Sequence, residues 1–367
     1  MSKKQNIFTS EYIIDGVHKE LTPAQILAEH CPMAPPVSSP FPEEAVVDES
    51  LDPTPGLLDY NPSRIRKYLA RTFTAKREFP VFFSGTYTRI KLARSLVDVL
   101  WHKGHFRLED LSLRAVWHWD DSRMGNMAAF YDSVSEAADC LDSLGLTLRS
   151  YKCVPAEDGL DVEFVPVMGL PAAGEEELGE QTASPKMGMR HVCPQTLVPD
   201  PESWIVYVPF DTAEFRLGGS LLNQVMGVSG GGKVPELEDP DYFEDCFEVV
   251  REFVEDGILL SGTGIGDGGL LTTLQGMAGE GVGASVDVSD LLRAYPGSDM
   301  VRVLFSEVPG VVIQIRDSDF DYLDAEFLLQ DIAYFPLGHP TSESGRVVVR
   351  RSSSAGIQNI LESLIRQ

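Results

Sequence analysis

Residues 257–290 read GILLSGTGIGDGGLLTTLQGMAGEGVGASVDVSD. An apolar run, ILLS, enters a cluster of glycines, and a run with helical spacing, LLTTLQGMA, leaves it. A second strand-like run, ASVDV, follows. This order predicts a strand, a glycine turn, a helix and a further strand. Three uses of the turn are open: it binds a dinucleotide, it binds a phosphate, or it only shapes its own backbone.

The second half of the chain continues this pattern on both sides of the turn. Strands are predicted at SWIVYVPF, GVVIQI, AYFPLG and RVVVRR, and helices at GGSLLNQVMG and DFDYLDAEFLLQDI. A longer helix, DPDYFEDCFEVVREFVEDG, has Asp239 as its N-cap and Pro240 at its first position. We therefore predict a layered α+β or α/β structure without an internal repeat.

The first half also alternates between strands and helices. FPVFF, LSLRAVWHW, LTLRSYKCV and LDVEFVPVM are predicted strands. RIKLARSLVDVLWHKG and NMAAFYDSVSEAADCLDSLG are predicted helices, and Gly145 fits the position just after the second one. The acidic stretch at 171–189, PAAGEEELGEQTASPKMGM, is a predicted loop near a domain boundary.

These elements suggest four segments. Residues 1–60 are a predicted arm, because seven prolines between Pro32 and Pro55 prevent regular structure, with one short helix at LTPAQILAEH before them. We expect this arm to be mobile, so that its removal leaves the melting temperature nearly unchanged. A first domain is expected at 61–197, a second at 198–351, and a C-terminal helix or tail at 352–367.

Composition limits the partners and the compartment. The chain has 56 acidic and 30 basic residues, a formal net charge of −26, which argues against nucleic acid or an anionic membrane as a partner. No apolar stretch approaches the roughly 20 residues that span a bilayer. The five cysteines, at 31, 140, 153, 193 and 246, show no paired spacing, which suits free thiols in a reducing compartment. We expect a soluble cytoplasmic protein.

Two glycine motifs have competing interpretations. Gly264, Gly266 and Gly269 form a Gly-x-Gly-x-x-Gly pattern between a strand and a helix, as in dinucleotide sites. No doubly wound series surrounds it, however, and Asp267 would place a carboxylate beside the pyrophosphate. GVSGGGKV, residues 227–234, matches Gly-x4-Gly-Lys, but a valine stands where the metal-binding hydroxyl belongs, so a flexible loop is favoured.

The histidines give weak signals. His102 and His105 are three residues apart, but Gly104 ends the predicted helix between them, so a helix C-terminus with favourable cations is preferred to a metal site. His118 fits a strand face better than a catalytic role. The chain shows no nucleophile–base signature of a serine hydrolase or a cysteine protease.

Four segments of the second half occur in an order found in a known family. They are RLGGSLLNQV, DPDYFEDCFEVVREFVEDGILLS, GDGGLLTTLQGMAGEGVGASVDV and VLFSEVPGVVIQI. Together they resemble the C-terminal half of phosphoribosylformylglycinamidine synthase, in the superfamily of aminoimidazole ribonucleotide (AIR) synthetase. Upstream, RIKLARSLVDVLW and the region from LSLRAVW to LTL resemble the end of the first domain of that half. The resemblance extends over roughly residues 79–351.

The resemblance implies an ATP-dependent ligase of purine synthesis, which makes an amidine from an amide and ammonia. It implies a ferredoxin-like first domain that pairs with a second copy to form a β-barrel, here without its usual opening section. It also implies an α/β sandwich as the second domain. ATP or ADP with Mg²⁺ would bind between the two domains, so the glycine turn is expected to line an ATP-type cleft with helix N-terminal amides facing phosphate.

The resemblance also assigns candidate site residues, and catalytic residues stay unknown. The nucleotide or phosphate group is expected at Lys152, Gly218, Gly219, Ser220, Asp267, Gly268 and Gly269. The metal is expected at Asp98, Asp267 and Glu307.

Several positions depart from the family pattern. The family's Gly-Lys-Asp-Ser corresponds to YKCV here, which keeps Lys152 but has Cys153 and Val154 in place of the acid and the hydroxyl. Arg94 stands where the family has a metal-binding Glu, and Thr263 and Gly264 stand where it has a His-Asp pair. A cation at Arg94 would repel magnesium. The glycines that shape the backbone are kept, whereas polar working groups are lost.

Two functions follow from this pattern. The first is a non-catalytic structural or regulatory module, with residual nucleotide binding at most. The second is an active ATP-dependent ligase subunit that uses Lys152, Asp98, Asp267 and Glu307. In both cases we expect a homodimer, or pairing with a related synthetase half, through the first domain. The contact would use an open sheet face carrying Trp117, Trp119, and Phe164 or Val165. The main alternative is that the N-terminal arm of the same chain covers this face.

Overall fold

The computed structural model describes residues 7–31, 62–103, 106–123, 125–156, 159–168, 190–191, 193–227, 235 and 237–350. Several predictions fall outside these residues: the acidic loop at 171–189, most of the glycine-rich loop at 227–234, and the C-terminal helix or tail at 352–367. His105 also lies outside them.

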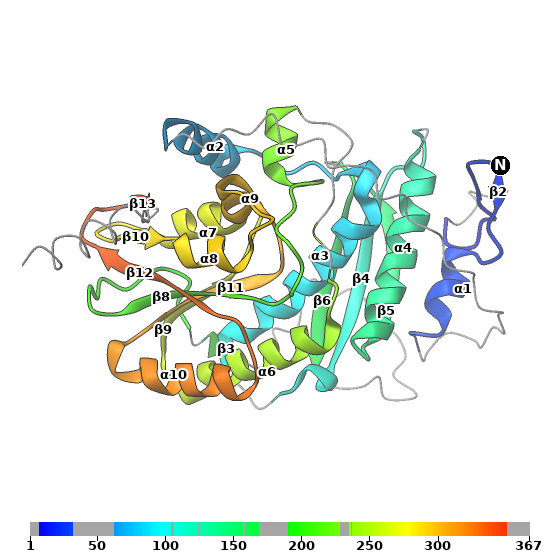
Figure 1. Ribbon diagram of the computed structural model, residues 1–367. Helices are drawn as coiled ribbons and strands as arrows, with labels where there is room; N and C mark the ends of the chain where they lie inside the picture. Colours follow the sequence, from blue (N-terminus) through cyan, green and yellow to red (C-terminus); the bar gives the residue numbers. More distant parts are fainter. Residues whose placement is uncertain are drawn as a thin grey trace, which may run out of the picture.

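One layer is an open three-stranded sheet with the order β5-β4-β6. The central strand β4 (Leu111–Trp119) is parallel to β5 (Thr147–Pro155) and antiparallel to β6 (Asp161–Met168). Helices α3 (Ser84–Val97) and α4 (Asn126–Ser143) pack against each other beside this sheet (Figure 1). These strands and helices confirm the predicted alternation, and Gly145 follows α4 with a φ of 61° as expected.

The other layer is a six-stranded sheet with the order β13-β10-β12-β8-β11-β9. Neighbouring strands are antiparallel except β10 and β13, which are parallel. The strands are β8 (Trp204–Pro209), β9 (Leu259–Gly264), β10 (Gly283–Asp287), β11 (Gly310–Ile315), β12 (Phe335–Thr341) and β13 (Val347–Arg350). All six fall where the sequence predicts strands.

Helices cover both faces of the six-stranded sheet (Figure 1). Alternate residues of β11 show this: Val312 lies in one apolar cluster, whereas Val311 and Ile313 lie in the other. The cluster around Val312 includes residues of α2 (Pro62–Thr74), α5 (Leu221–Met226), α7 (Gly269–Met277), α8 (Ser289–Ala294) and α9 (Met300–Phe305). The opposite cluster includes α6 (Pro240–Asp256) and α10 (Asp317–Leu329). The chain therefore has a mixed α+β fold, as the sequence predicts.

Local signals account for the ends of α6. Asp239 accepts a hydrogen bond from the Tyr242 backbone N–H at 3.0 Å, and Pro240 occupies the first turn, where no intrahelical N–H bond is lost. Its buried stripe includes Phe243, Phe247 and Val254. The predicted cap and apolar face of this helix are thus confirmed.

Short elements connect the two layers. Helix α3 continues into the 3₁₀ helix η3 (Asp98–Trp101), and a second 3₁₀ helix, η4 (Leu108–Asp110), precedes β4. Strand β3 (His102–Lys103) pairs with β7 (Arg190–His191). His102 is therefore in a short strand rather than at a helix end.

The predicted strand FPVFF is wrong. Residues Val81–Phe83 form a 3₁₀ helix, η2, that leads directly into α3. Phe79 packs edge-on against the rings of Tyr87 and Trp119, with centroid distances of 5.3 and 5.0 Å, whereas Phe82 is 85% exposed. One aromatic side chain in this run thus has a buried site on α3 and β4, and the run adds no strand to the sheet.

The N-terminal segment is also corrected. Residues 7–31 contain a small hairpin of β1 (Ile13–Ile14) and β2 (Val17–His18), and the helix α1 (Pro23–Ala28) with the predicted Thr22 cap. Phe8 is 6% exposed, and its ring lies 5.2 Å from Phe130 and 5.8 Å from Trp117. The expectation of a mobile arm is wrong for residues 7–31, because this aromatic anchor fixes the segment to the body.

The prediction that the sheet face carrying Trp117 and Trp119 is open is wrong. Trp117 is fully buried and donates from Nε1 to the Ser133 hydroxyl of α4 at 2.9 Å. Trp119 and Phe164 are 3% and 6% exposed and belong to the same cluster. Only Val165, which alternates with Phe164 along β6, lies on the other face. The aromatic side of this sheet is already covered by α3, α4 and Phe8.

Candidate functional site

The candidate site lies where α3 and the segment before η2 meet three parts of the six-stranded layer. These parts are the turn from β9 to α7, the loop from α9 to β11 and the start of α5. Two cations come from the first half of the chain, Arg77 and Arg94, and two acids come from the second, Asp267 and Glu307. We call these four residues the charged cluster.

The two arginines pair with both acids. Arg94 Nη1 donates to Asp267 Oδ1 at 2.6 Å, and its Nη2 lies 3.6 Å from Glu307 Oε2. Arg77 Nη2 donates to Glu307 Oε2 at 2.6 Å, and its Nε lies 3.9 Å from Asp267 Oδ1. Side-chain exposure is 10% for Arg77, 14% for Arg94, 34% for Asp267 and 1% for Glu307. The cluster is therefore mostly buried and has no net formal charge.

Glu307 also accepts hydrogen bonds from the first amides of two helices. Its Oε1 accepts hydrogen bonds from the backbone N–H groups of Leu221 and Gly268, both at 2.8 Å. Leu221 is the first residue of α5, and Gly268 is the N-cap of α7. Helix N-termini favour anions because their first N–H groups lack intrahelical partners. Here the anion is a side chain of the protein itself.

The turn between β9 and α7 needs glycine at positions 268 and 269 because of its backbone conformation. Gly268 and Gly269 have φ angles of +82° and +75°, a region that side chains other than glycine rarely adopt. A Cβ on Gly269 would also lie 2.5 Å from the carbonyl oxygen of Ser306. The turn thus brings α7 against the end of α9, one residue before Glu307. Asp267 does not cap α7 with its side chain, since Gly268 shows no side-chain cap and Asp267 bonds to Arg94.

The surroundings of the cluster shift the pKa values of Asp267, Arg77 and the neighbouring Tyr87. Burial opposes ionisation of Asp267, but Arg94 and Arg77 outweigh it and lower its pKa. Burial likewise opposes the charge on Arg77, yet Glu307 and Asp267 raise its pKa above the usual arginine value. Burial, followed by the charge of Asp267, raises the pKa of the neighbouring Tyr87 to about 12. The guanidinium of Arg77 lies 4.7 Å from the centre of the Tyr87 ring.

Magnesium does not fit these residues as they are arranged. Mg²⁺ needs free oxygen ligands in near-octahedral geometry, whereas both acids already bind guanidinium groups. A divalent cation would add to two buried positive charges. Among the described residues, no three acidic, histidine or cysteine side chains gather as a metal-binding group. Arg77 Nε and Arg94 Nε and Nη2 are buried donors without a hydrogen-bond acceptor, so the excess here is of donors rather than of metal ligands.

The structure brings most of the predicted site residues together, but not all of them. Ser220 caps α5 by accepting from the Asn223 N–H, directly before Leu221, and Gly218 and Gly219 precede it. Asp98 is exposed one helical turn after Arg94. In the described part of the chain, no hydrogen bond or ion pair joins Lys152 to Asp267 or Glu307. Arg77 was missed, because nothing in its local sequence, TAKRE, indicates a buried partner.

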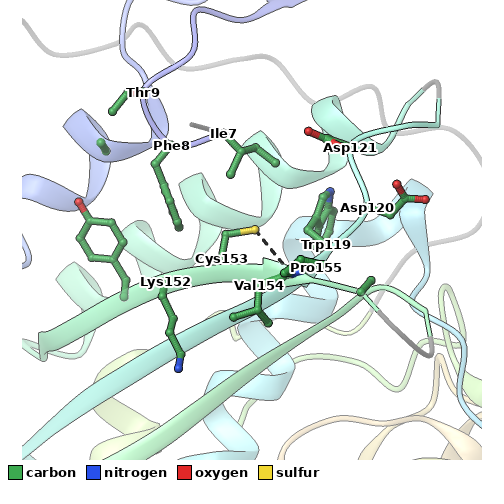
Figure 2. A pocket seen from close by; sticks show the side chains of 13 residues that line it. Ile7, Phe8, Thr9, Trp119, Asp120, Asp121, Lys152, Cys153, Val154 and Pro155 are labelled. Atoms are coloured by element: carbon green, nitrogen blue, oxygen red, sulfur yellow. Dashed lines mark hydrogen bonds between the residues drawn. The ribbon is translucent and has the colours of Figure 1, made fainter. Parts of the chain in front are cut away.

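A separate pocket of about 630 Å³ lies at the ends of β4 and β5 (Figure 2). Its walls include Phe8 and Ile7 of the N-terminal segment, Asp121 and Cys153. In Figure 2 the Lys152 side chain points to the opposite side of β5 from Cys153 and Phe8. Burial, and then the charge of Asp121, raises the pKa of the Cys153 thiol to about 11, so this cysteine is a protonated and weak nucleophile at neutral pH.

The cysteines and the lengths of the helices bear on two further expectations. All five cysteines are free thiols, as their spacing indicates. None of the helices in the described ranges has the length and apolar character needed to cross a bilayer.

Comparisons with known proteins show which proteins the chain resembles. Residues 204–349 match the family model described as AIR synthase related protein, C-terminal domain. The chain is 28% identical to human phosphoribosylformylglycinamidine synthase over 251 residues, which are 68% of this chain and 18% of that protein. It is 25% identical to a probable phosphoribosylformylglycinamidine synthase of Arabidopsis thaliana, described as chloroplastic/mitochondrial, over 262 residues, 69% of this chain and 17% of that protein. The chain thus spans less than a fifth of these relatives.

A solved structure titled T. maritima PurL complexed with FGAR aligns with 76% of this chain and 42% of its own, at 13% identity and a TM-score of 0.49. Residues 204–349 thus resemble the C-terminal domain of AIR synthase-related proteins, and about two thirds of the chain is similar to a part of phosphoribosylformylglycinamidine synthases.

Proposed function

We propose that this protein is a non-catalytic, structural or regulatory member of its family. The observation that carries the proposal is the pairing of Asp267 and Glu307 with Arg94 and Arg77. An ATP-dependent ligase needs magnesium on acidic side chains and donors on the phosphates. In this chain guanidinium groups stand at the acids and Glu307 stands at the helix amides. Side chains of the protein itself therefore take the places of both the metal and the phosphate.

Any residual binding of ATP or ADP would then be independent of magnesium. The reason is electrostatic: the two arginines already neutralise the acids that would hold the metal. A free nucleotide would also compete with the Glu307 carboxylate for the N–H groups of Leu221 and Gly268. Such binding is expected to be weak.

Calorimetry tests this proposal directly. ATP is titrated into the full chain with and without Mg²⁺, and phosphate release is followed in parallel over several hours. We expect no turnover and no gain in affinity from Mg²⁺. Sustained phosphate release that is lost in Asp267→Asn would overturn the proposal, because it would show that the acid acts on a bound nucleotide. A second titration with Arg94→Glu asks whether removing the cation creates a Mg²⁺ site.

Pairing with a second copy, or with a related synthetase half, is part of the same proposal. The side of the three-stranded sheet opposite α3 and α4 carries Val116, His118, Lys152, Val154 and Val165. On this side His118 lies 3.8 Å from Glu163, and the two side chains are 39% and 58% exposed. A half-apolar sheet face of this kind is better protected from water by a partner sheet.

Light scattering at micromolar concentration tests the pairing. We expect a dimer that Val116→Glu dissociates while the circular dichroism spectrum is retained. Ser143→Glu, which adds the same charge at an exposed position on α4, serves as the control and is expected to remain dimeric. A monomer at all concentrations would contradict the proposed pairing, but it would not bear on the proposal that the protein is non-catalytic.

A further inference from the structure

The solvent side of α10 carries large apolar side chains. Leu328 and Leu329 are 68% and 75% exposed, and Tyr322 is 43% exposed. Leu329 lies seven residues after Tyr322, so the two share one side of the helix, with the exposed Ala325 between them. We call Tyr322, Ala325, Leu328 and Leu329 the apolar stripe of α10.

The chain around this stripe is described without a gap. Residues 237–350 form one continuous range, which includes α6 and the connection from α10 to β12. Figure 1 shows α6 and α10 side by side. The ring of Phe253 in α6 lies 5.3 Å from Phe327 and 6.0 Å from Tyr322. The high exposure of the two leucines shows that neither the neighbouring helix nor the following loop covers the stripe.

Both helices at this surface are strongly acidic. Helix α10, DSDFDYLDAEFLL, has five acidic residues and no basic one. Helix α6, PDYFEDCFEVVREFVED, has seven acidic residues and one basic residue, Arg251. Arg251 is 8% exposed and pairs with acids of its own helix. The two helices therefore present carboxylates to solvent without cations that balance them.

The ring of Tyr322 lies among these carboxylates. Its hydroxyl donates to Asp256 Oδ2 of α6 at 3.5 Å, and Glu326 follows one helical turn later on α10. Burial raises the pKa of Tyr322, and the charges of Glu326 and Asp256 raise it further. No cation in the described ranges lies within ion-pair distance of Asp256 or Glu326. Negative charge and exposed apolar area thus meet at one end of the stripe.

We propose that the apolar stripe of α10 binds a basic amphipathic helix of a partner protein. Apolar side chains of the partner would cover Leu328 and Leu329. An arginine or lysine beside them would pair with Asp256 and Glu326 against the ring of Tyr322. The proposal does not depend on the proposed function, because it uses none of the residues of the charged cluster.

Charge disfavours the other occupants of this surface. A two-fold contact uses the same patch of both subunits, so a second copy bound through the stripe would place the acids of α6 and α10 against themselves. Nucleic acid and an anionic membrane would meet the same repulsion. A partner with both apolar and basic side chains would cover the leucines and also neutralise the carboxylates beside them.

Fluorescence anisotropy with two labelled peptides tests the proposal on the full chain. One peptide is a helix former of about 18 residues, with leucines at i, i+3, i+4 and i+7 and arginines between them. The other has the same arginines but serine at the leucine positions, so it measures the charge attraction alone. We expect the leucine peptide to bind at least about tenfold more tightly, because only its side chains can cover the stripe.

The apolar part of the contact is located with Leu328→Ser combined with Leu329→Ser. This variant is expected to bind the two peptides with equal affinity. Its circular dichroism spectrum is expected to match that of the parent, because both leucines are exposed.

The charged part is located with Asp256→Asn combined with Glu326→Gln. We expect this variant to bind the leucine peptide about fivefold more weakly than the parent does. The control is Glu20→Gln combined with Glu280→Gln, which removes the same charge from exposed positions on other segments. Its affinity is expected to stay within about twofold of the parent value.

Several outcomes would overturn the proposal. They are equal binding of the two peptides by the parent, a leucine preference that persists in the double-serine variant, or equal weakening by the charge variant and its control. A dimer that the double-serine variant dissociates would assign the stripe to a second copy instead. Leucine-dependent binding that appears only after residues 351–367 are removed would mean that the chain itself supplies the occupant.

Discussion

Two contacts fasten α3 and η3 to the six-stranded layer, and they differ in chemistry. At one, the fully buried ring of Trp101 lies so close to Gly262 of β9 that a Cβ there would clash, and Val97 lies against Gly264. At the other, Arg94 of α3 forms an ion pair with Asp267, which lies in the turn between β9 and α7. The first contact is purely apolar, and the second is a mostly buried ion pair.

The difference separates what shapes the fold from what decides the function. The apolar contact needs a large ring, Trp101, and a glycine, Gly262. Such a contact is compatible with an active and with an inactive protein. The charged contact uses Asp267 and Glu307, the acids at which the family resemblance predicts a metal. Under the proposed function its composition therefore bears on catalysis, whereas the composition of the apolar contact bears only on stability.

Removing the ring should have the largest effect. Trp101→Ala deletes a fully buried side chain and leaves a cavity against β9, so we expect a loss of about 3–5 kcal/mol in the free energy of unfolding. Urea denaturation followed by circular dichroism measures it. A loss below about 1 kcal/mol would mean that the surrounding helices close the space and that the ring is not a fixed contact.

Breaking the buried ion pair should have the next largest effect. Arg77→Met leaves the carboxylate of Glu307, which is 1% exposed, without its closest cation, and we expect a loss of about 3 kcal/mol. Adding Glu307→Gln should restore part of it, because the glutamine oxygen can still accept from both backbone N–H groups. Equal stability of the single and double variants would show that the charge on Glu307 needs no partner.

The pH dependence of stability should distinguish the two contacts with a smaller effect. The folded pKa of Asp267 is lowered, so its contribution is present above the unfolded value of about 3.9 and is lost as pH falls through the folded pKa. Asp267→Asn should therefore be less stable than the parent at pH 7, and the two should converge towards pH 2.5. The deficit of Trp101→Ala should change much less over this range, which makes it the control. A constant deficit in Asp267→Asn would contradict the assignment.

Local signals were sufficient for most helices and strands. The cap of α6, the glycine after α4 and the alternation of β4 depend on residues close in sequence, so they were predictable. The N-terminal segment was not, because Phe8 is held by rings of β4 and α4 more than a hundred residues away. Nothing in the sequence around Phe8 shows that its ring packs against residues so far away in the chain.

The candidate site was predictable in part for the same reason. Asp267, Gly268 and Glu307 were found through the family resemblance, and Arg94 was recognised as a departure from it. That Arg94 bonds to Asp267 depends on how α3 meets β9, which the order of elements does not specify. The role of Arg77 is a purely tertiary property, since its partner Glu307 is 230 residues away.

The distance in sequence between Glu307 and its partners has a consequence for synthesis of the chain. Glu307 joins Arg77, the start of α5 and the start of α7, and every one of these segments leaves the ribosome before it does. Closing so long a loop has an entropic cost that only the completed layers can offset. Until residue 307 has emerged, two buried arginines and two helix ends lack their shared anion. We therefore expect the charged cluster to be the last part of the protein to acquire its native structure, and a nascent chain halted before residue 307 to be sensitive to protease at α5 and α7.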